Sequence, residues 1–276
     1  MQDASKPIWA NKEPIKKLSE LDLDIAPFSI FVATPVHSEV SIHFCQALLE
    51  FQQYCFANKV RVQFQLLKSS LVTQGRNLCV SAFMESKMTH LLFVDSDIDF
   101  QSESIFKMID SNKDVISIPY PLKTIDWDKI FENLKKGFIK NSVELSTSGY
   151  TYPMRVENPN SLKMENGIME VTNAPAGCML IKRNVIEKMI KAYPDLEILQ
   201  PTIINGKDVN KPYFYNFFDT MFDKTNKKYF GEDFAFCKRW TDIGGKCYAY
   251  INDYITHVGE HQYCGKFIDE LSSVKK

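Results

Sequence analysis

Four consecutive apolar residues, Leu91 to Val94, lead directly into an Asp-Ser-Asp sequence at residues 95–97. A short, unbroken apolar run bounded by polar residues is typical of a strand that is buried on both faces, as in a mostly parallel sheet. In open α/β sheets the ligand binds beyond the carboxyl ends of such strands. The stretch therefore predicts an α/β fold that places two carboxylates, Asp95 and Asp97, at the ligand-binding edge of its sheet.

The two carboxylates suggest a cation site. Side chains alternate along a strand, so Asp95 and Asp97 point the same way if the extended backbone continues through them. Neighbouring carboxylates repel each other, and a cation between them relieves the repulsion. Oxygen ligands suit Mg²⁺ or Mn²⁺, which usually bind one or two carboxylates together with substrate phosphates. The alternative is a strand-to-helix turn in which Asp or Ser caps a helix over 102–110.

The first half of the chain alternates apolar runs with helical patterns, which is the signature of a doubly wound α/β fold. The pattern predicts strands over 28–35, 60–66, the run ending at Val94, and 115–119, with helices over 41–57, 78–88 and 102–110 between them. The second half is less regular. It predicts a short helix over 128–136, a strand over 178–181, a helix over 184–192, an irregular segment over 194–228, a helix over 232–242 and a last strand over 247–251.

The sequence contains no repeat, low-complexity tract or linker, so one domain is the simplest organisation for its 276 residues. Residues 1–26 carry two prolines and little periodicity, and we expect them to form an amino-terminal extension. The domain itself is predicted over 27–268, with a carboxyl-terminal tail over 269–276.

Charge and cysteine content narrow the class of protein. A net charge of −1 provides no global field that attracts nucleic acid or an anionic membrane. The seven cysteines include no C-x-x-C pair, which favours reduced thiols over a disulfide framework or a zinc site. The first residues lack the apolar core of a signal peptide, and no apolar run is long enough to be a transmembrane segment. We expect a soluble, cytoplasmic protein and leave its oligomeric state open.

Four pieces of sequence follow one another in a characteristic order. They are a strand ending at Ala33-Thr34-Pro35, the Asp95-Ser96-Asp97 motif, the small-residue turn 173–178 leading into a strand, and Glu232-Asp233 at a helix start followed by a strand and His257. In this order they resemble the nucleotide-sugar-dependent glycosyltransferases of the GT-A fold, closest in style to glycosyltransferase family 2. The resemblance spans roughly residues 28–260 and implies a single GT-A (Rossmann-like) domain with a mixed, mostly parallel central sheet flanked by helices.

The resemblance implies a metal-dependent glycosyltransferase. Such an enzyme moves a sugar from a nucleoside diphosphate sugar, here a UDP-sugar, to a hydroxyl of a saccharide or glycoconjugate acceptor, here with inversion. A Mn²⁺ or Mg²⁺ ion neutralises the leaving diphosphate as a Lewis acid. By resemblance Asp97 binds the ion directly, Asp95 binds the ribose or reaches the ion through water, and His257 is a further metal ligand. The alternative for His257 is a capped loop histidine, which would be the preferred interpretation without the Asp-Ser-Asp motif.

The resemblance also makes Asp233 the general base, with Glu232 as second choice or as an acceptor-binding partner. The helix N-terminus lowers the pKa of Asp233, so burial must compensate if it is to act as an effective base. The alternative for both acids is the common structural role of negative charge at a helix start. If the enzyme retains configuration, Asp233 is not the base, and the sequence leaves this open.

The resemblance places donor-binding residues on several segments. They are Thr34, Pro35, Val36, Arg76, Asn77, Asp95, Ser96, Lys123, Ala176 and Gly177. Backbone groups of 34–36 frame the base, and Arg76 reaches the pyrophosphate or the carboxylate of Asp95. Ala176 and Gly177 permit close approach of the sugar or the acceptor. Arg76 and Asn77 are otherwise an exposed helix start, and the aromatic run 213–218 either contacts a saccharide or fills the core.

Two other functions stay open. A sugar nucleotidyltransferase is expected to carry a glycine-rich, basic phosphate loop after the first strand, whereas Thr34 to Ser38 contains neither glycine nor lysine. A non-catalytic carbohydrate-binding or scaffold protein on a transferase-like fold would retain glycan binding after Asp97→Ala. A glycosyltransferase would associate peripherally with glycan assembly machinery. The sequence names neither the sugar nor the base, the acceptor or the linkage.

Overall fold

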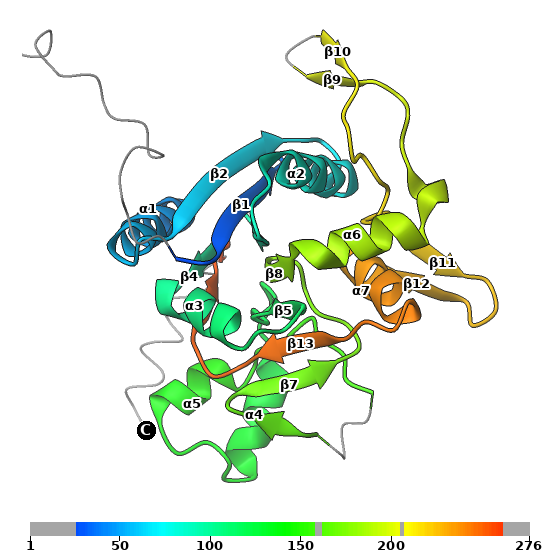
Figure 1. Ribbon diagram of the computed structural model, residues 1–276. Helices are drawn as coiled ribbons and strands as arrows, with labels where there is room; N and C mark the ends of the chain where they lie inside the picture. Colours follow the sequence, from blue (N-terminus) through cyan, green and yellow to red (C-terminus); the bar gives the residue numbers. More distant parts are fainter. Residues whose placement is uncertain (1–25, 158–161, 205–206, 262–276) are drawn as a thin grey trace, which may run out of the picture.

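The apolar strand that precedes Asp95 lies inside an eight-stranded sheet of the computed structural model, which describes residues 26–157, 162–204 and 207–261 (Figure 1). In spatial order the strands are β2 (Arg61–Lys68), β1 (Ser29–Val36), β3 (His90–Val94), β8 (Cys178–Lys182), β5 (Val115–Ser117), β13 (Cys247–Tyr250), β7 (Ile168–Val171) and β6 (Met164–Glu165). Of the predicted extension 1–26 only residue 26 is described, and the tail 269–276 lies outside the described residues.

The sheet is mixed and mostly parallel, which confirms the predicted fold class. Strands β2, β1 and β3 run parallel to one another, as do β5 and β13. Strand β8 is antiparallel to both β3 and β5, and β7 is antiparallel to β13 and β6. Because β8 comes from the second half of the chain and lies between two strands of the first half, both halves belong to one Rossmann-like sheet.

Helices cover both faces of this sheet. One face packs against α1 (Ile42–Ala57) and α3 (Ser102–Asp110), and the other against α2 (Val72–Ser86), α6 (Arg183–Ala192) and α7 (Glu232–Asp242). Along β3, Leu91 and Phe93 enter the core cluster with α2, α6 and α7, whereas Leu92 and Val94 enter the cluster with α1 and α3. The apolar run is therefore buried on both faces, as its sequence predicts.

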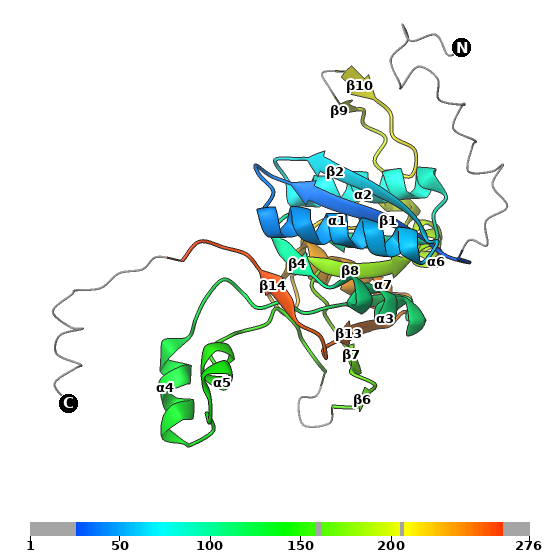
Figure 2. The same cartoon turned by 90° about the vertical axis from the view of Figure 1, so that its left-hand side faces the viewer.

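Shorter elements project from this body. Figure 2 shows α4 (Trp127–Lys135) and α5 (Ser142–Thr147) standing away from the sheet. The segment predicted to be irregular over 194–228 contains a 3-10 turn (Pro194–Leu196) and two hairpins, β9 (Thr202–Ile204) with β10 (Lys207–Val209) and β11 (Met221–Asp223) with β12 (Lys228–Phe230). In the described part of the chain no helix has the length and apolar character needed to cross a membrane.

Predicted helix bounds agree best where a polar start precedes a periodic run. Helices α3 and α7 span the predicted residues, but α2 runs from Val72 to Ser86 instead of 78–88. Gly75 permits the early start, because a Cβ atom there would lie only 3.1 Å and 3.2 Å from Cβ atoms of Ser69 and Pro35. Lys87 adopts a left-handed conformation (φ 59°) and ends the helix before Met88.

The aromatic run 213–218 fills the core. Phe217 and Phe218 are fully buried, and the ring of Phe218 stacks on that of Phe236 with centroids 4.4 Å apart. Phe93 of β3 contacts the same Phe218 ring edge-on at 5.3 Å. Of the two alternatives for this run, packing in the core is the one that the structure confirms for these residues.

Replacing Phe218 with alanine is expected to lower the free energy of unfolding by about 3–5 kcal/mol, because the variant leaves a cavity between β3 and α7. Denaturant unfolding measures the difference. Phe222→Ala on β11 is the matched control, since its side chain is 58% exposed, and we expect it to change stability by less than about 0.5 kcal/mol. Equal losses in the two variants would contradict the packing described here.

Candidate active site

The chain turns immediately after β3. The amide of Ile98 donates to the carbonyl of Asp95 at 3.1 Å, and β4 (Ile98–Phe100) begins directly afterwards. The extended backbone therefore does not continue through the Asp-Ser-Asp motif. Asp95 and Asp97 bind different partners, so the expectation that they share one face of a continuing strand is wrong.

Asp95 is held by a buried guanidinium. Arg76 on α2 is 3% exposed, and its Nη2 atom donates to both carboxylate oxygens of Asp95, at 2.9 Å and 3.2 Å. Its Nε atom donates to Glu232 at the start of α7 over 3.4 Å. Burial alone lowers the pKa of Arg76, but the two carboxylates outweigh this effect and raise the pKa. The contact between Arg76 and Asp95 is one that the resemblance implied, and Arg76 is not an exposed helix residue.

Asp97 meets His257 because of a short strand pairing. β4 pairs antiparallel with β14 (Ile255–His257), which places His257 opposite Ile98. The Nε2 atom of His257 lies 3.4 Å from Oδ2 of Asp97, and the ammonium of Lys123 donates to the same oxygen at 2.5 Å. Burial raises the pKa of Asp97, but the hydrogen bonds from His257 and Lys123 outweigh burial and lower it to about 2.

The Asp97–His257 pair fits a divalent metal ion. His257 Nδ1 lies 2.9 Å from the carbonyl oxygen of Pro121, which only accepts, so Nδ1 carries a proton. A ring that is protonated at Nδ1 alone has a lone pair on Nε2, and a cation between Nε2 and the carboxylate would then satisfy both acceptors in place of the hydrogen bond from His257 to Asp97. Metal-binding histidines are commonly oriented by such a carbonyl. The ammonium of Lys123 supplies positive charge at the carboxylate in this structure.

The site offers a metal few protein ligands. Among residues 26–157, 162–204 and 207–261, no three Asp, Glu, His or Cys side chains gather closely enough to hold a metal ion together. Asp95 is engaged by Arg76, which agrees with a ribose-binding or water-mediated role better than with direct coordination. Two protein ligands suit Mg²⁺ or Mn²⁺ where substrate phosphates complete the coordination.

Asp233 lies half-buried at the start of α7. Its Oδ1 atom accepts a hydrogen bond from the amide of Phe234 at 2.7 Å. Burial and the neighbouring charge of Glu232 outweigh the amide hydrogen bonds, and the pKa of Asp233 rises to about 6. The effect of the helix N-terminus on this pKa is therefore overcome by burial. A carboxylate of this basicity is suited to accept a proton near neutral pH.

Tyr120 lies near both the Asp97–His257 pair and the carboxylates of Asp95 and Asp233. Its ring packs edge-on against His257 with centroids 4.9 Å apart. Burial raises the pKa of its hydroxyl, and the charges of Asp95 and Asp233 raise it further. A Cβ atom on Gly177 would lie 2.5 Å from the Tyr120 ring. The close approach that we expected a ligand to make at Gly177 is thus made by Tyr120.

The predicted base-binding residues are structural parts of the sheet. Strand β1 extends through Val36, pairing with β2 along its whole length, and the carbonyl of Val36 accepts from the amide of Ser69 at 2.9 Å. Thr34 is fully buried, and its hydroxyl has no hydrogen-bond partner among the described residues. The structure therefore places residues 34–36 at the carboxyl end of β1, beside α2.

The remaining predicted residues lie nearby. The carbonyl of Ser96 accepts from the amide of Ser41, which caps α1, at 2.8 Å, and Ala176 is fully buried. Asn77 contacts a different part of the molecule from its neighbour Arg76. Its side-chain amide donates to Asn216 and accepts from the amide of Phe218, both at 2.9 Å, so it anchors the aromatic run.

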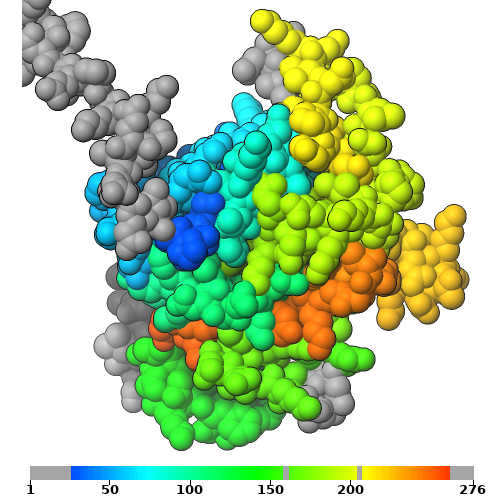
Figure 3. Space-filling model, in the orientation of Figure 1, coloured from blue at the N-terminus to red at the C-terminus, as the bar shows by residue number. Residues whose placement is uncertain are grey.

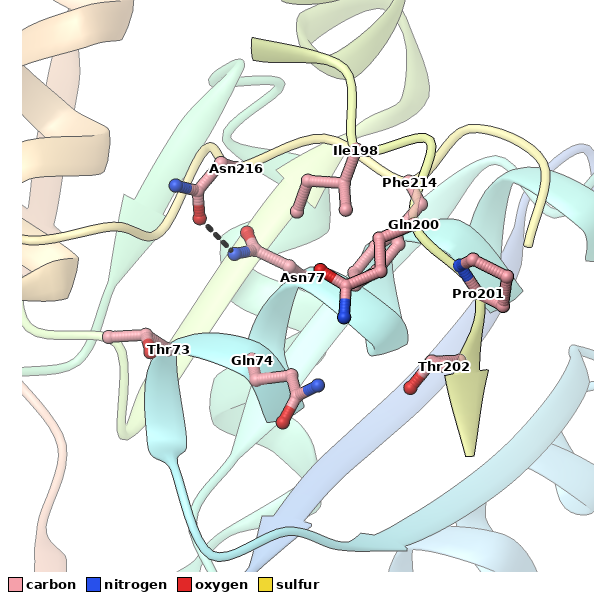
Figure 4. A pocket seen from close by; sticks show the side chains of 9 residues that line it. All are labelled: Thr73, Gln74, Asn77, Ile198, Gln200, Pro201, Thr202, Phe214 and Asn216. Carbon is pink, nitrogen blue, oxygen red and sulfur yellow. Dashed lines mark hydrogen bonds between the residues drawn. The ribbon is translucent and has the colours of Figure 1, made fainter. Parts of the chain in front are cut away.

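Asn77 also borders a cavity that the sequence analysis missed. The cavity has a volume of about 220 Å³ and lies between the first turns of α2 and the segment 198–216 (Figure 4). Its lining consists of amide, hydroxyl and apolar side chains, without a charged group. These residues are Thr73, Gln74, Asn77, Ile198, Gln200, Pro201, Thr202, Phe214 and Asn216. A neutral, hydrogen-bonding lining of this kind suits a polyhydroxylated ligand. No pattern in the sequence joins these two segments.

Comparisons with known proteins identify no family. No protein-family model matches the chain, and no curated protein matches it.

Solved structures similar to this chain include three of different kinds. The A197 protein of STIV is 16% identical, with 86% of this chain and 98% of that chain covered and a TM-score of 0.42. A glycosyltransferase involved in glycosylation of the major capsid of PBCV-1 is 10% identical, with 60% of this chain and 66% of that chain covered and a TM-score of 0.30. The 4-diphosphocytidyl-2C-methyl-D-erythritol synthase of Anaerococcus prevotii is 9% identical, with 82% of this chain and 90% of that chain covered and a TM-score of 0.39. These likenesses assign no activity to the chain.

Asp233→Asn is expected to stabilise the protein at neutral pH. Because the pKa of Asp233 rises from 3.8 to about 6, the folded protein binds this proton more tightly than the unfolded chain does. Its contribution to stability is full below about pH 4 and is lost as the pH rises through about 6. The asparagine variant escapes this loss, so we expect it to match wild type near pH 4 and to exceed it by about 2 kcal/mol near pH 7. Denaturant unfolding at the two pH values measures this, and an equal difference at both would contradict the raised pKa.

Proposed function

We propose that this protein is a metal-dependent glycosyltransferase that moves a sugar from a nucleoside diphosphate sugar, a UDP-sugar, to a hydroxyl of a saccharide acceptor with inversion. One observation carries the proposal. The metal-suited pair of Asp97 and His257 and the basic carboxylate of Asp233 both lie around Tyr120. Glycosyl transfer needs both functions in one place, since the leaving diphosphate must be neutralised while the acceptor is deprotonated.

The donor's diphosphate would be met by cationic groups. A Mn²⁺ or Mg²⁺ ion held by Asp97 and His257 supplies Lewis acidity toward the phosphates. Lys123 binds Asp97 in this structure and is positioned to contact a phosphate oxygen once the carboxylate engages the ion. The Nη1 atom of Arg76 has no hydrogen-bond partner among the described residues, although it is buried. Arg76 thus supplies fixed positive charge beside Asp95.

Asp233 would accept the proton of the acceptor hydroxyl. As that O–H bond breaks, the acceptor oxygen forms a bond to the anomeric carbon, and the bond from this carbon to the phosphate oxygen breaks. The electron pair of the broken bond leaves on the diphosphate. A pKa of about 6 leaves most Asp233 side chains ionised at neutral pH while making them stronger bases than an ordinary aspartate. Glu232 is bound to Arg76, which favours Asp233 over Glu232 for this role.

The acceptor would occupy the uncharged cavity beside Asn77. Its amide and hydroxyl groups can donate to and accept from sugar hydroxyls, and Phe214 and Ile198 offer apolar surface to a sugar ring. The cavity adjoins α2, whose Arg76 contacts both Asp95 and Glu232. A neutral saccharide matches this lining better than a charged ligand does.

Asp97→Ala is expected to remove metal-dependent nucleotide binding, because the ion loses its carboxylate ligand. Calorimetric titration of UDP in the presence of Mn²⁺ measures the affinity, and we expect a loss of at least about 100-fold. Asp99→Ala is the matched control, since this carboxylate lies on the adjacent β4 and no hydrogen bond or ion pair joins it to a site residue within the described part of the chain. Unchanged Mn²⁺-dependent affinity in Asp97→Ala would remove the metal site from the proposal.

Asp233→Asn is expected to bind the donor normally but to lose transfer. The amide is nearly isosteric and cannot take the acceptor's proton, so turnover should fall by about 10²–10⁴-fold. Release of the nucleoside diphosphate in the presence of donor and a saccharide acceptor measures turnover. Asp242→Asn, at the other end of the same helix, is the control. Near-normal turnover in Asp233→Asn would exclude Asp233 as the base.

A further inference from the structure

The region that carries α4 and α5, residues 127–147, exposes many large apolar side chains. We call it the α4–α5 tip. It projects from the sheet in Figure 2 and forms the lower edge of the molecule in Figure 3. Six large apolar side chains of the tip are exposed, namely Trp127, Phe131, Leu134, Phe138, Val143 and Leu145. The one apolar side chain of α4 that is buried is Ile130, which packs beside Gly149.

Three of the exposed residues form a stripe on α4. Trp127, Phe131 and Leu134 are spaced four and three residues apart, so they share one side of α4. Phe138 follows in the turn after the helix and is 69% exposed. Single exposed apolar residues are common on soluble proteins, but contiguous groups of this kind mark contact surfaces.

Charges of both signs flank this stripe, and the lysines gather at the turn after α4. Asp126 accepts from the amide of Lys129 at 2.8 Å and caps α4, and a carboxylate oxygen of Glu144 accepts from the amide of Lys140 at 2.7 Å. Glu132 pairs with Lys135 at 3.6 Å.

The turn itself carries the surplus charge. The ammonium groups of Lys136 and Lys140, on either side of Phe138, have no carboxylate partner among the described residues. Between Glu132 and Glu144 the chain has three lysines and no acid, whereas Asp126 and Asp128 lie at the other end of α4. The tip therefore combines an apolar stripe with positive charge that is concentrated at this turn.

We propose that the α4–α5 tip binds an anionic membrane surface. Trp127, Phe131 and Phe138 would enter the headgroup region, while Lys136 and Lys140 contact lipid phosphates. Aromatic and aliphatic residues on one side with flanking lysines are the composition that interfacial helices use, and long lysine side chains keep their charge at the headgroups while their stems cover apolar surface.

This attraction is local. The net charge of −1 supplies no global field toward such a surface, so binding depends on the tip alone. A projecting, convex tip also suits a lipid surface better than a partner helix, which needs a groove.

The tip is also fixed to the candidate active site. The amide of Leu122 donates to Thr151 at 2.8 Å, and the amide of Asp126 donates to Gly149 at 3.1 Å, which closes the base of the tip. Between these two contacts lies Lys123, which binds Asp97. Membrane binding would thus hold the site close to the lipid surface. The inference does not depend on the proposed activity.

Flotation of the full-length protein with lipid vesicles tests the proposal. Vesicles of phosphatidylcholine with phosphatidylglycerol should carry the protein at low salt, whereas pure phosphatidylcholine vesicles should carry much less. We expect Lys136→Ala combined with Lys140→Ala to weaken binding by about 30-fold, since each lysine near an anionic surface contributes about fivefold. Phe131→Ser combined with Phe138→Ser should reduce binding at least as strongly.

Phe56→Ser is the matched control, because Phe56 is 85% exposed at the end of α1, outside the tip. It should bind vesicles like wild type. Circular dichroism checks that all variants are folded, as expected for substitutions at exposed positions. Three results would overturn the proposal, namely no binding of the wild type to anionic vesicles, equal losses in Phe56→Ser and the tip variants, or a concentration-dependent dimer in solution that Phe138→Ser abolishes.

Discussion

The buried guanidinium of Arg76 is the interaction on which the candidate site depends. It reaches Asp95 at the end of β3 and Glu232 at the start of α7, and its Cζ atom lies over the Phe93 ring, 5.2 Å from the ring centroid. A charge that is 3% exposed is costly unless it is paired, and removal of a partner from a buried pair costs more than the pair itself contributes. Arg76 therefore fixes the carboxyl end of the sheet to the helix that carries Asp233.

Two strand pairings bring the rest of the site to this point. β8 is antiparallel between β3 and β5, which places Gly177 beside the end of β3, where its carbonyl accepts from the amide of Asp95 at 2.9 Å. The pairing of β14 with β4 returns the chain to the motif and sets His257 against Asp97. The two carboxylates of the motif thus have separate tasks. Asp95 belongs to the ion-pair network of Arg76, and Asp97 pairs with Lys123 and His257.

Local patterns predicted much of this arrangement. The buried strand and the bounds of α3 and α7 followed from apolar runs and helical periodicity, and the meeting of Asp97 with His257 followed from the family resemblance. The early start of α2 did not, because it depends on the packing of Gly75 against β1. Contacts between distant segments were equally hidden, such as Tyr120 against Gly177. The pKa of Asp233 depends on burial, which a helix start in a sequence does not reveal.

The central claim is that Asp97 and His257 form a metal site that serves a nucleotide. Isothermal titration of the wild-type protein with UDP, first with Mn²⁺ and then with a chelator, tests it most directly. We predict saturable binding with Mn²⁺ that the chelator abolishes, and weaker binding of nucleotides with other bases. If the folded protein binds none of these nucleotides in the presence of Mn²⁺, or binds UDP equally well with the chelator, the claim is contradicted.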